Sequence, residues 1–197
     1  EAHPIRRVTG EYGCNPTFFT DARIPASCLM GEEGGGWTVA MKTLEYERGV
    51  TAGQASAYWG VAVQVDDMID ELSAIEQDGE PLLSDPIVRD DLVGFMMEAK
   101  ALSLSARRMA IPALGTDYPM GLALSVKYRG TEYERRMKHY TASKQGAQSA
   151  LYVGDDDAVS GGFWQRAYFS NFGATIGGGT TQVQANIVAE HVLGLPK

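Results

Sequence analysis

Two stretches of the sequence carry residues that could take part in chemistry, and the first is residues 44–48. It contains the carboxylates of Glu45 and Glu47, and the residues after it are mostly small: Gly49, Thr51, Ala52, Gly53, Ala55, Ser56 and Ala57. Small side chains let a ligand approach a helix closely, so a carboxylate here could act as a general base on a bound substrate. The alternative is that both glutamates are solvated or paired with Arg48, and that the small residues only permit tight helix packing.

The second stretch is residues 176–184, where three glycines lead directly into Thr180 and Thr181. A helix that begins at these threonines would offer unpaired N–H groups and the positive end of its dipole, and glycine would let a ligand approach the backbone. An anionic or nucleotide ligand could bind there. An ordinary loop with a threonine cap fits the same residues equally well.

Other catalytic signatures are missing from the sequence. His3, His139 and His191 have no Cys, Asp or Glu at metal-ligand spacing, which favours surface or packing roles. The glycine-rich residues 31–36 precede a helix without the Lys-Ser/Thr pair of a phosphate-binding loop. The net charge of −8 and pI near 4.9 argue against nucleic acid and anionic membrane surfaces as partners.

The sequence also indicates the cellular compartment of the protein. No run of eighteen apolar residues is present, so we expect no transmembrane helix. With two cysteines, Cys14 and Cys28, free thiols in a cytoplasmic protein are favoured over a disulfide. The sequence opens at Glu1 without a Met, and we expect a segment upstream of it.

The elements that would position these residues are mostly helices. Residues 5–10 and 17–21 are short β-rich stretches among turn residues. A first long helix is predicted from near Trp37 to about Gln77. Its apolar stripe is spaced 4, 3, 4 and 3 and consists of Val61, Val65, Met68, Leu72 and Ile75.

Further helices complete the prediction. The second begins at residues 84–86 and ends at Pro112, with the stripe Val88, Leu92, Phe95, Ala99, Leu102, Ala106 and Met109. A third spans about 118–150, with an outward face of Glu132, Glu134, Arg135, Arg136 and Lys138. The last two lie near 163–174 and 180–193, with Gly194 as a stop signal. The predicted fold is mainly α, an antiparallel four-helix-type bundle with a short β remnant in front.

These motifs together resemble a known family. Residues 19–25 (FTDARIP) and 29–37 (LMGEEGGGW) resemble the end of the middle β-domain of acyl-CoA dehydrogenases, which typically reads F.D.RVP..NLLGEEG.GW. Residues 177–195 (GGGTTQVQANIVAEHVLGL) look like the family's last helix, and residues 44–48 match its first long carboxy-terminal helix. The resemblance covers essentially the whole chain in order.

The resemblance implies a division at residue 30. Residues 1–30 would be the end of the middle β-domain and residues 31–197 the C-terminal helical-bundle domain, without the amino-terminal half of the family's subunit. Such subunits assemble as homo- or hetero-oligomers, dimers or tetramers, around FAD. They desaturate an acyl-CoA thioester: a carboxylate removes the α-proton while hydride passes from the β-carbon to the flavin. The implied cofactor-binding residues are Gly178, Gly179, Thr180, Thr181 and Gln182.

The sequence departs from the family at the base. Many members carry the catalytic Glu two residues before the Thr of the final motif, in YEGT, and Gly178 stands there in this chain. Other members place the base on the first bundle helix, in LDLER, and Glu47 occupies that position in LEYER. The resemblance therefore favours Glu47 as the base, with Arg48 beside it contacting the substrate.

Two flavin-contacting motifs of the family are also not recognisable. No Arg of the R..FG motif lies near residues 75–79, and no Q..GG.G element is recognisable around 145–162. These departures suit a branch in which two different subunits form a heterotetramer, or a subunit that is not catalytic. Three functions remain: a dehydrogenase subunit with Glu47 as base, a structural partner that completes another subunit's FAD site through residues 180–182, and a flavin monooxygenase-type relative.

Overall fold

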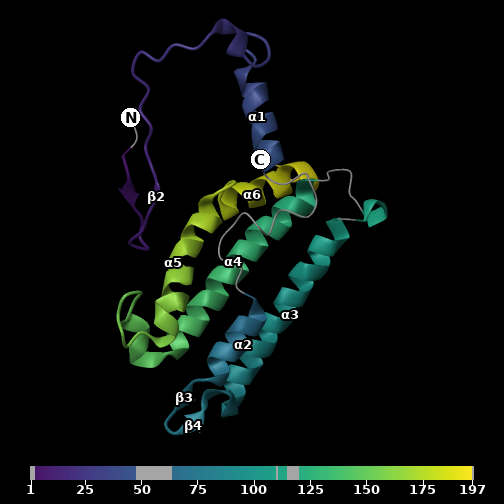
Figure 1. The fold of residues 1–197 in the computed structure, drawn as a ribbon. Coiled ribbons are helices and arrows are strands. Elements are labelled where there is room, and N and C mark those ends of the chain that lie inside the picture. The colour runs from purple at the N-terminus through teal and green to yellow at the C-terminus, as the bar shows by residue number, and fades with distance from the viewer. Residues whose placement is uncertain (1–2, 48–63, 110, 115–119, 197) are drawn as a thin grey trace.

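The computed structural model describes residues 3–47, 64–109, 111–114 and 120–196, which are mainly helical (Figure 1). The helices are α1 Gly36–Glu47, α2 Val65–Ser73, α3 Pro86–Met109, α4 Met120–Lys144, α5 Phe163–Ile176 and α6 Thr181–Ile187, which a π-helical turn extends over Val188–Val192. The strands are β1 Ile5–Arg6, β2 Tyr12–Cys14, β3 Glu76–Gln77 and β4 Glu80–Pro81, paired as two antiparallel hairpins. The predicted mainly α fold is confirmed.

The long helices α3, α4 and α5 lie side by side, with α2 against α3 and α4 (Figure 1). Their core joins the apolar stripes of four helices: Met68 and Leu72 from α2, Val88 and Leu92 from α3, Tyr133 and Met137 from α4, and Trp164 and Ala167 from α5. The 4-3 spacing therefore identified the core faces of α2 and α3 correctly. Near the end of α3 the apolar stripe no longer lies in the core, as the exposed Ala106 shows.

Local capping chemistry explains where two helices begin. At α2, the side chain of Gln64 accepts from the third residue of the helix, while Asp67 accepts from the N–H of Gln64 at 2.7 Å, forming a capping box. At α3, Pro86 occupies the first helical position, and the carboxylate of Asp85 accepts from the N–H of Ile87 at 2.8 Å. The start predicted for the second helix at residues 84–86 is confirmed.

Two sequence predictions about the elements are wrong, and one hairpin was not predicted. The strand expected at 17–21 does not form, and β1 pairs instead with β2. The first long helix was expected to reach Gln77, but α2 ends at Ser73 and Gln77 lies in β3. A second hairpin, β3–β4, follows because Asp78 and Gly79 adopt positive φ values of 55° and 82°, which a two-residue hairpin turn requires.

The outward face predicted for α4 also needs a correction. The side chain of Lys138 is only 1% exposed, because it points between α4 and α5 instead of into solvent. Its ammonium group donates to Glu134 on the same helix and to Asn171 on α5. Asn171 is 33 residues away in the sequence, so the local charge pattern could not reveal this buried contact.

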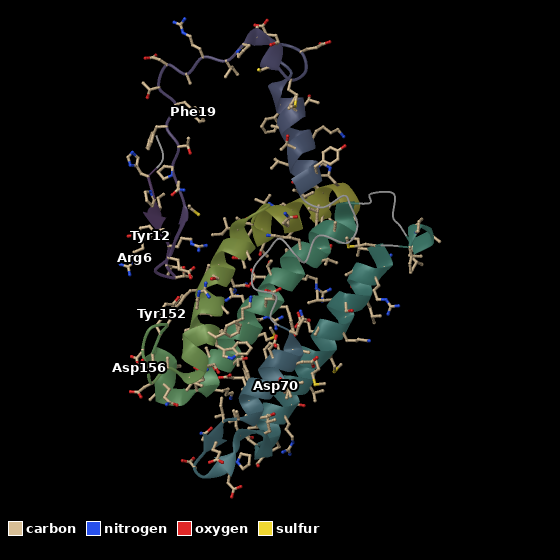
Figure 2. All side chains as sticks on the ribbon, viewed as in Figure 1. Arg6, Tyr12, Phe19, Asp70, Tyr152 and Asp156 are labelled. Atoms are coloured by element: carbon tan, nitrogen blue, oxygen red, sulfur yellow. The ribbon has the colours of Figure 1, made fainter. Side chains whose placement is uncertain are left out.

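Residues 3–47 form an arm that extends away from the helical bundle before returning through α1 (Figure 1). Its hairpin contacts the bundle: the Tyr152 hydroxyl donates to the carbonyl of Thr9 at 3.1 Å, and Arg166 of α5 forms an ion pair with Glu11. Figure 2 shows Tyr152 near this hairpin and Phe19 far out on the arm. The arm exposes many large apolar side chains: Ile5, Val8, Tyr12, Phe18, Phe19, Ile24, Leu29, Met30, Trp37, Met41 and Tyr46.

Candidate functional site

The glycine–threonine stretch forms the turn between α5 and α6. α5 ends at Ile176, and Gly178 and Gly179 adopt φ values of 67° and 105°, which side-chain-bearing residues rarely adopt. Thr180 is the N-cap of α6, and its hydroxyl accepts from the N–H of Val183 at 3.3 Å. The predicted threonine cap is therefore present, at the start of a helix whose first N–H groups lack intrahelical partners.

Two side chains fix the backbone of this turn. Lys127 of α4 donates to the carbonyl of Gly179 at 2.7 Å, and Gln184 of α6 donates to the carbonyl of Gly178. Gln184 is fully buried, and a Cβ added to Gly179 would lie 2.8 Å from its amide nitrogen. A side chain at position 179 would collide with this amide. The turn therefore presents backbone alone at this position.

A carboxylate on α4 anchors the first residue of α6. The Thr181 hydroxyl donates to one oxygen of Glu132 at 2.8 Å, and Arg135 donates to the other at 3.0 Å. Burial raises the pKa of Glu132, but the hydrogen bonds from Thr181 and Arg135 and the charges of Arg135 and Arg136 outweigh it, so the net shift is downward. Glu132 is therefore ionised at neutral pH, and its carboxylate accepts the hydrogen bond that holds Thr181 in place.

Below the turn, polar contacts continue along the seam between α4 and α5. Asn171 accepts from Lys138 at 2.8 Å and donates to the carbonyl of Thr131 at 2.8 Å, and Lys138 also reaches Glu134 at 2.7 Å. Because buried polar groups destabilise a fold unless they are hydrogen-bonded, this seam fixes the register of α5 against α4. That register in turn sets the position of the α5–α6 turn.

The residues behind the turn were not predicted from the sequence. Lys127, Thr131, Glu134 and Lys138 are spaced 4, 3 and 4 along α4. That spacing is typical of a core stripe, yet every member is polar. Polar residues at core spacing are a signal that a buried hydrogen-bond network faces a neighbouring helix.

The structure places the other predicted site residues as follows. Glu47 is the last residue of α1, but its side chain lies outside the described part of the chain, as does that of Glu45. Arg48 and the small residues 49–57 also lie outside it. Gly178, Gly179, Thr180, Thr181 and Gln182 lie together in the turn and the first turn of α6, where Gln182 is exposed.

Metal sites and membrane-spanning helices are absent from the described residues. No group of three or more His, Cys, Asp or Glu side chains there could hold a metal ion. Within the same residues, no helix is both long and apolar enough to cross a membrane. Cys14 and Cys28 are exposed free thiols.

Comparison with known proteins decides the family. Residues 34–193 match the model of the acyl-CoA dehydrogenase C-terminal domain. The chain belongs to the acyl-CoA dehydrogenase family. The matched region runs from the glycines before α1 to the end of α6 and its π-helical extension, so it includes the turn and the α4 residues behind it. The family resemblance expected from the sequence motifs is confirmed.

Similar proteins include mycobacterial acyl-CoA dehydrogenases. The chain is 33% identical over 199 residues to acyl-CoA dehydrogenase IpdE1 of Mycolicibacterium smegmatis, covering 100% of this chain and 46% of that protein. Among solved structures, it resembles the Tcur3481–Tcur3483 steroid ACAD G363A variant, with a TM-score of 0.76, 27% identity, and coverage of 100% of this chain and 50% of that one. The ChsE4–ChsE5 complex of Mycobacterium tuberculosis shares the fold at 23% identity, with a TM-score of 0.79 and the same coverages. The chain thus spans about half the length of the relatives it matches.

Proposed function

We propose that this chain is the C-terminal part of an FAD-dependent acyl-CoA dehydrogenase subunit that desaturates an acyl-CoA thioester between its α- and β-carbons. The observation that carries the proposal is the family match over residues 34–193, which extends through the glycine–threonine turn. The exposed free thiols of Cys14 and Cys28 support a cytoplasmic location, where thiols stay reduced.

The α5–α6 turn is the part of the described chain that best fits FAD. The close approach of Gln184 to Gly179 keeps a side chain out of the turn, and α6 directs its positive dipole end there. We assign the cofactor contacts to Gly178, Gly179, Thr180, Thr181 and Gln182. When bound, FAD supplies the hydride acceptor of the reaction; the turn's role is to bind and orient it.

We assign the general base to Glu47 and a substrate contact to Arg48. A carboxylate is the group that α-proton abstraction needs, and the family's other base position is occupied by Gly178, which has no side chain. Glu47 is the last described residue of α1. The sequence after Arg48 consists mostly of small residues, which would let an acyl-CoA come close to this carboxylate.

The test is Glu47→Gln in the complete gene product that carries this chain. Turnover of acyl-CoA with a dye as electron acceptor should fall about 10²–10⁴-fold, because the amide cannot accept the α-proton. The flavin absorbance per subunit should not change. Glu45→Gln is the matched control, since it removes a carboxylate from the same helix, and it should retain activity. Full activity in Glu47→Gln would refute the assignment.

A second function is favoured by Gly178 and by the solved relatives. In this alternative, the chain is a non-catalytic subunit that completes the FAD site of a different acyl-CoA dehydrogenase subunit through Thr180, Thr181 and Gln182. The support is that two structural relatives carry paired names, ChsE4–ChsE5 and Tcur3481–Tcur3483. Co-expression with a second dehydrogenase subunit would then be required for flavin binding, and Glu47→Gln would leave the activity of the complex intact.

Oligomeric assembly is part of the proposal. The arm of residues 3–47 exposes a series of large apolar side chains, and Phe19 is 82% exposed. Surfaces of this kind attract partners or other parts of the same polypeptide. We therefore propose that the full protein is a homo- or hetero-oligomer, a dimer or tetramer, in which these side chains are covered.

A further inference from the structure

Lys127 holds the α5–α6 turn from the side of α4, which packs against both helices (Figure 1). Its ammonium group donates to the carbonyl of Gly179 at 2.7 Å and to the carbonyl of Thr175, in the last turn of α5, at 3.5 Å. A cation at this position is also favoured by the negative end of the α5 dipole. One half-buried lysine thus joins the end of α5 to the peptide that leads into α6.

The contact with Gly179 sets the direction of a peptide group. In a planar trans peptide, the N–H points away from the carbonyl to which it is joined. The carbonyl of Gly179 is turned toward Lys127, so the N–H of Thr180 points away from Lys127 and from α4. Within the described part of the chain, this N–H has no hydrogen-bond partner. The lysine therefore presents a backbone donor on the side of the turn that faces away from α4.

The residues on both sides of this peptide are held as well. Before it, the N–H of Gly179 donates to the carbonyl of Ile176 at 3.2 Å. After it, the hydroxyl of Thr181 donates to Glu132 of α4 at 2.8 Å. The peptide that carries the Thr180 N–H therefore lies between two anchored residues, and Lys127 determines which way its carbonyl points.

The fold keeps a second side chain against the turn although this destabilises the interior. Gln184 is fully buried and donates to the carbonyl of Gly178, but its own side-chain oxygen has no partner among the described residues. A buried acceptor without a donor is unfavourable and rare in folded proteins. The arrangement is explained if the geometry of the turn matters to a bound molecule more than to the stability of the bundle.

We propose that Lys127 is a positioning residue for FAD: by holding the carbonyl of Gly179, it aims the N–H of Thr180 at an acceptor oxygen of the bound cofactor. Lys127 itself does not contact FAD. This proposal rests on the assignment of FAD to the α5–α6 turn made above, but not on the catalytic role of Glu47. It holds equally if the flavin site is shared with another subunit, because the turn contributes the same donor in both cases.

The first test is Lys127→Met, which removes the ammonium group and keeps most of the side-chain length. In the complete gene product, purified as its native assembly, the dissociation constant for FAD should rise at least about tenfold, because the Thr180 N–H is no longer held toward its acceptor. Lys127→Arg should retain most of the affinity, since a guanidinium can still donate to the carbonyl. Lys100→Met removes a lysine from an exposed position of α3 and is the matched control. The measurement is titration of flavin-free protein with FAD, followed by flavin fluorescence.

The second test is a double-mutant cycle, which separates positioning from a general loss of structure. Thr180→Pro removes the N–H, and the φ of −61° at Thr180 is one that proline adopts. Thr180→Ala removes only the capping hydroxyl, so the difference between these two variants isolates the N–H. Thr180→Pro should bind FAD at least about tenfold more weakly than Thr180→Ala. Adding Lys127→Met to Thr180→Pro should weaken binding by less than about twofold more, because both changes remove the same contact.

The outcomes distinguish this proposal from the proposed function. If the unmodified complete product bound no FAD, the proposed function would fail and the role of Lys127 with it. If Thr180→Pro weakened binding but Lys127→Met did not, or if Lys127→Met weakened it equally in both backgrounds, FAD would still contact the turn and only the role of Lys127 would be refuted. If Thr180→Pro did not fold, Leu92→Ala would decide, since it destabilises the core away from the turn. Equal loss of FAD affinity in Leu92→Ala and Lys127→Met would overturn the proposal; unchanged affinity in Leu92→Ala alone would support it.

Discussion

Replacement of Lys138 tests whether the buried polar seam between α4 and α5 stabilises the fold. Its ammonium group lies 2.7 Å from Glu134 and 2.8 Å from Asn171, and the side chain is 1% exposed. Lys138→Ala removes three methylene groups, at about 0.8 kcal/mol each. It also leaves the buried carbonyl of Asn171 without this donor, which costs about 1–3 kcal/mol.

The sum of these losses is about 3–5 kcal/mol. Glu134 adds little to it, because its side chain is 29% exposed and its carboxylate can regain water. Lys138→Met keeps most of the volume and loses only the polar contacts, so its cost should be about 1–3 kcal/mol. The gap of about 2 kcal/mol between the two variants measures the packing of the lysine stem.

The assay is urea denaturation followed by circular dichroism, with the free energy of unfolding taken at unchanged slope. Lys100→Ala, at an exposed position of α3, is the control and should change stability by less than about 0.5 kcal/mol. The double variant Lys138→Met/Asn171→Leu should lose less free energy of unfolding than the sum of the two single variants, because it also removes the side-chain carbonyl that Lys138→Met leaves unpaired. If Lys138→Ala cost less than about 1 kcal/mol, the lysine would not be buried and paired in solution.

Further predictions concern single groups. Gly162 has a φ of 73°, and an added Cβ would lie 2.5 Å from the backbone nitrogen of Val153, whereas Gly154 has a φ of 98° and open surroundings. Gly154→Ala should destabilise the fold by about 1–2 kcal/mol through backbone strain alone, and Gly162→Ala should destabilise it by more. Thermal unfolding of the two variants measures the difference. Burial raises the pKa of the Tyr133 phenol to about 12, and its buried hydroxyl has no hydrogen-bond partner among the described residues, so Tyr133→Phe should be neutral or stabilise by up to about 1 kcal/mol in urea unfolding. The pKa of Glu132 is lowered in the folded state, so the ionised carboxylate stabilises the fold at neutral pH, and this stabilisation is lost as the pH falls through the lowered pKa. In Glu132→Gln, the free energy of unfolding should therefore decrease less between pH 7 and pH 3 than in the unmodified protein.

The parts of the fold that were predictable depend on local signals. The apolar spacing of Val88 and Leu92 identified the core face of α3, and Asp85 with Pro86 marked its start, because periodicity and capping act within a few residues. The β3–β4 hairpin was missed although Asp78 and Gly79 are a turn signal. Its strands are only two residues long and carry no alternation that a pattern could detect.

In the candidate site, too, only the residues with a local sequence signal could be predicted. The glycine–threonine turn could be found because a run of glycines before a capping threonine is a local signal. Lys127 and Gln184 could not be recognised as the groups that fix it. Lys127 reaches a carbonyl 52 residues away, and Gln184 is buried only because α6 packs against α4. Contacts of this kind arise from tertiary packing, which the chain's local propensities do not encode.

The geometry of Gly178 bears on how this chain differs from relatives with a glutamate at that position. Its φ of 67° lies in the left-handed region, where a residue with a side chain is disfavoured by about 1–2 kcal/mol. Its carbonyl also accepts from the buried Gln184, so the turn cannot rotate without breaking that hydrogen bond. Gly178→Glu would therefore need a rearranged turn before its carboxylate could replace Glu47 as a base. The glycine suits a turn that presents backbone to a ligand, which agrees with assigning proton abstraction to a different helix.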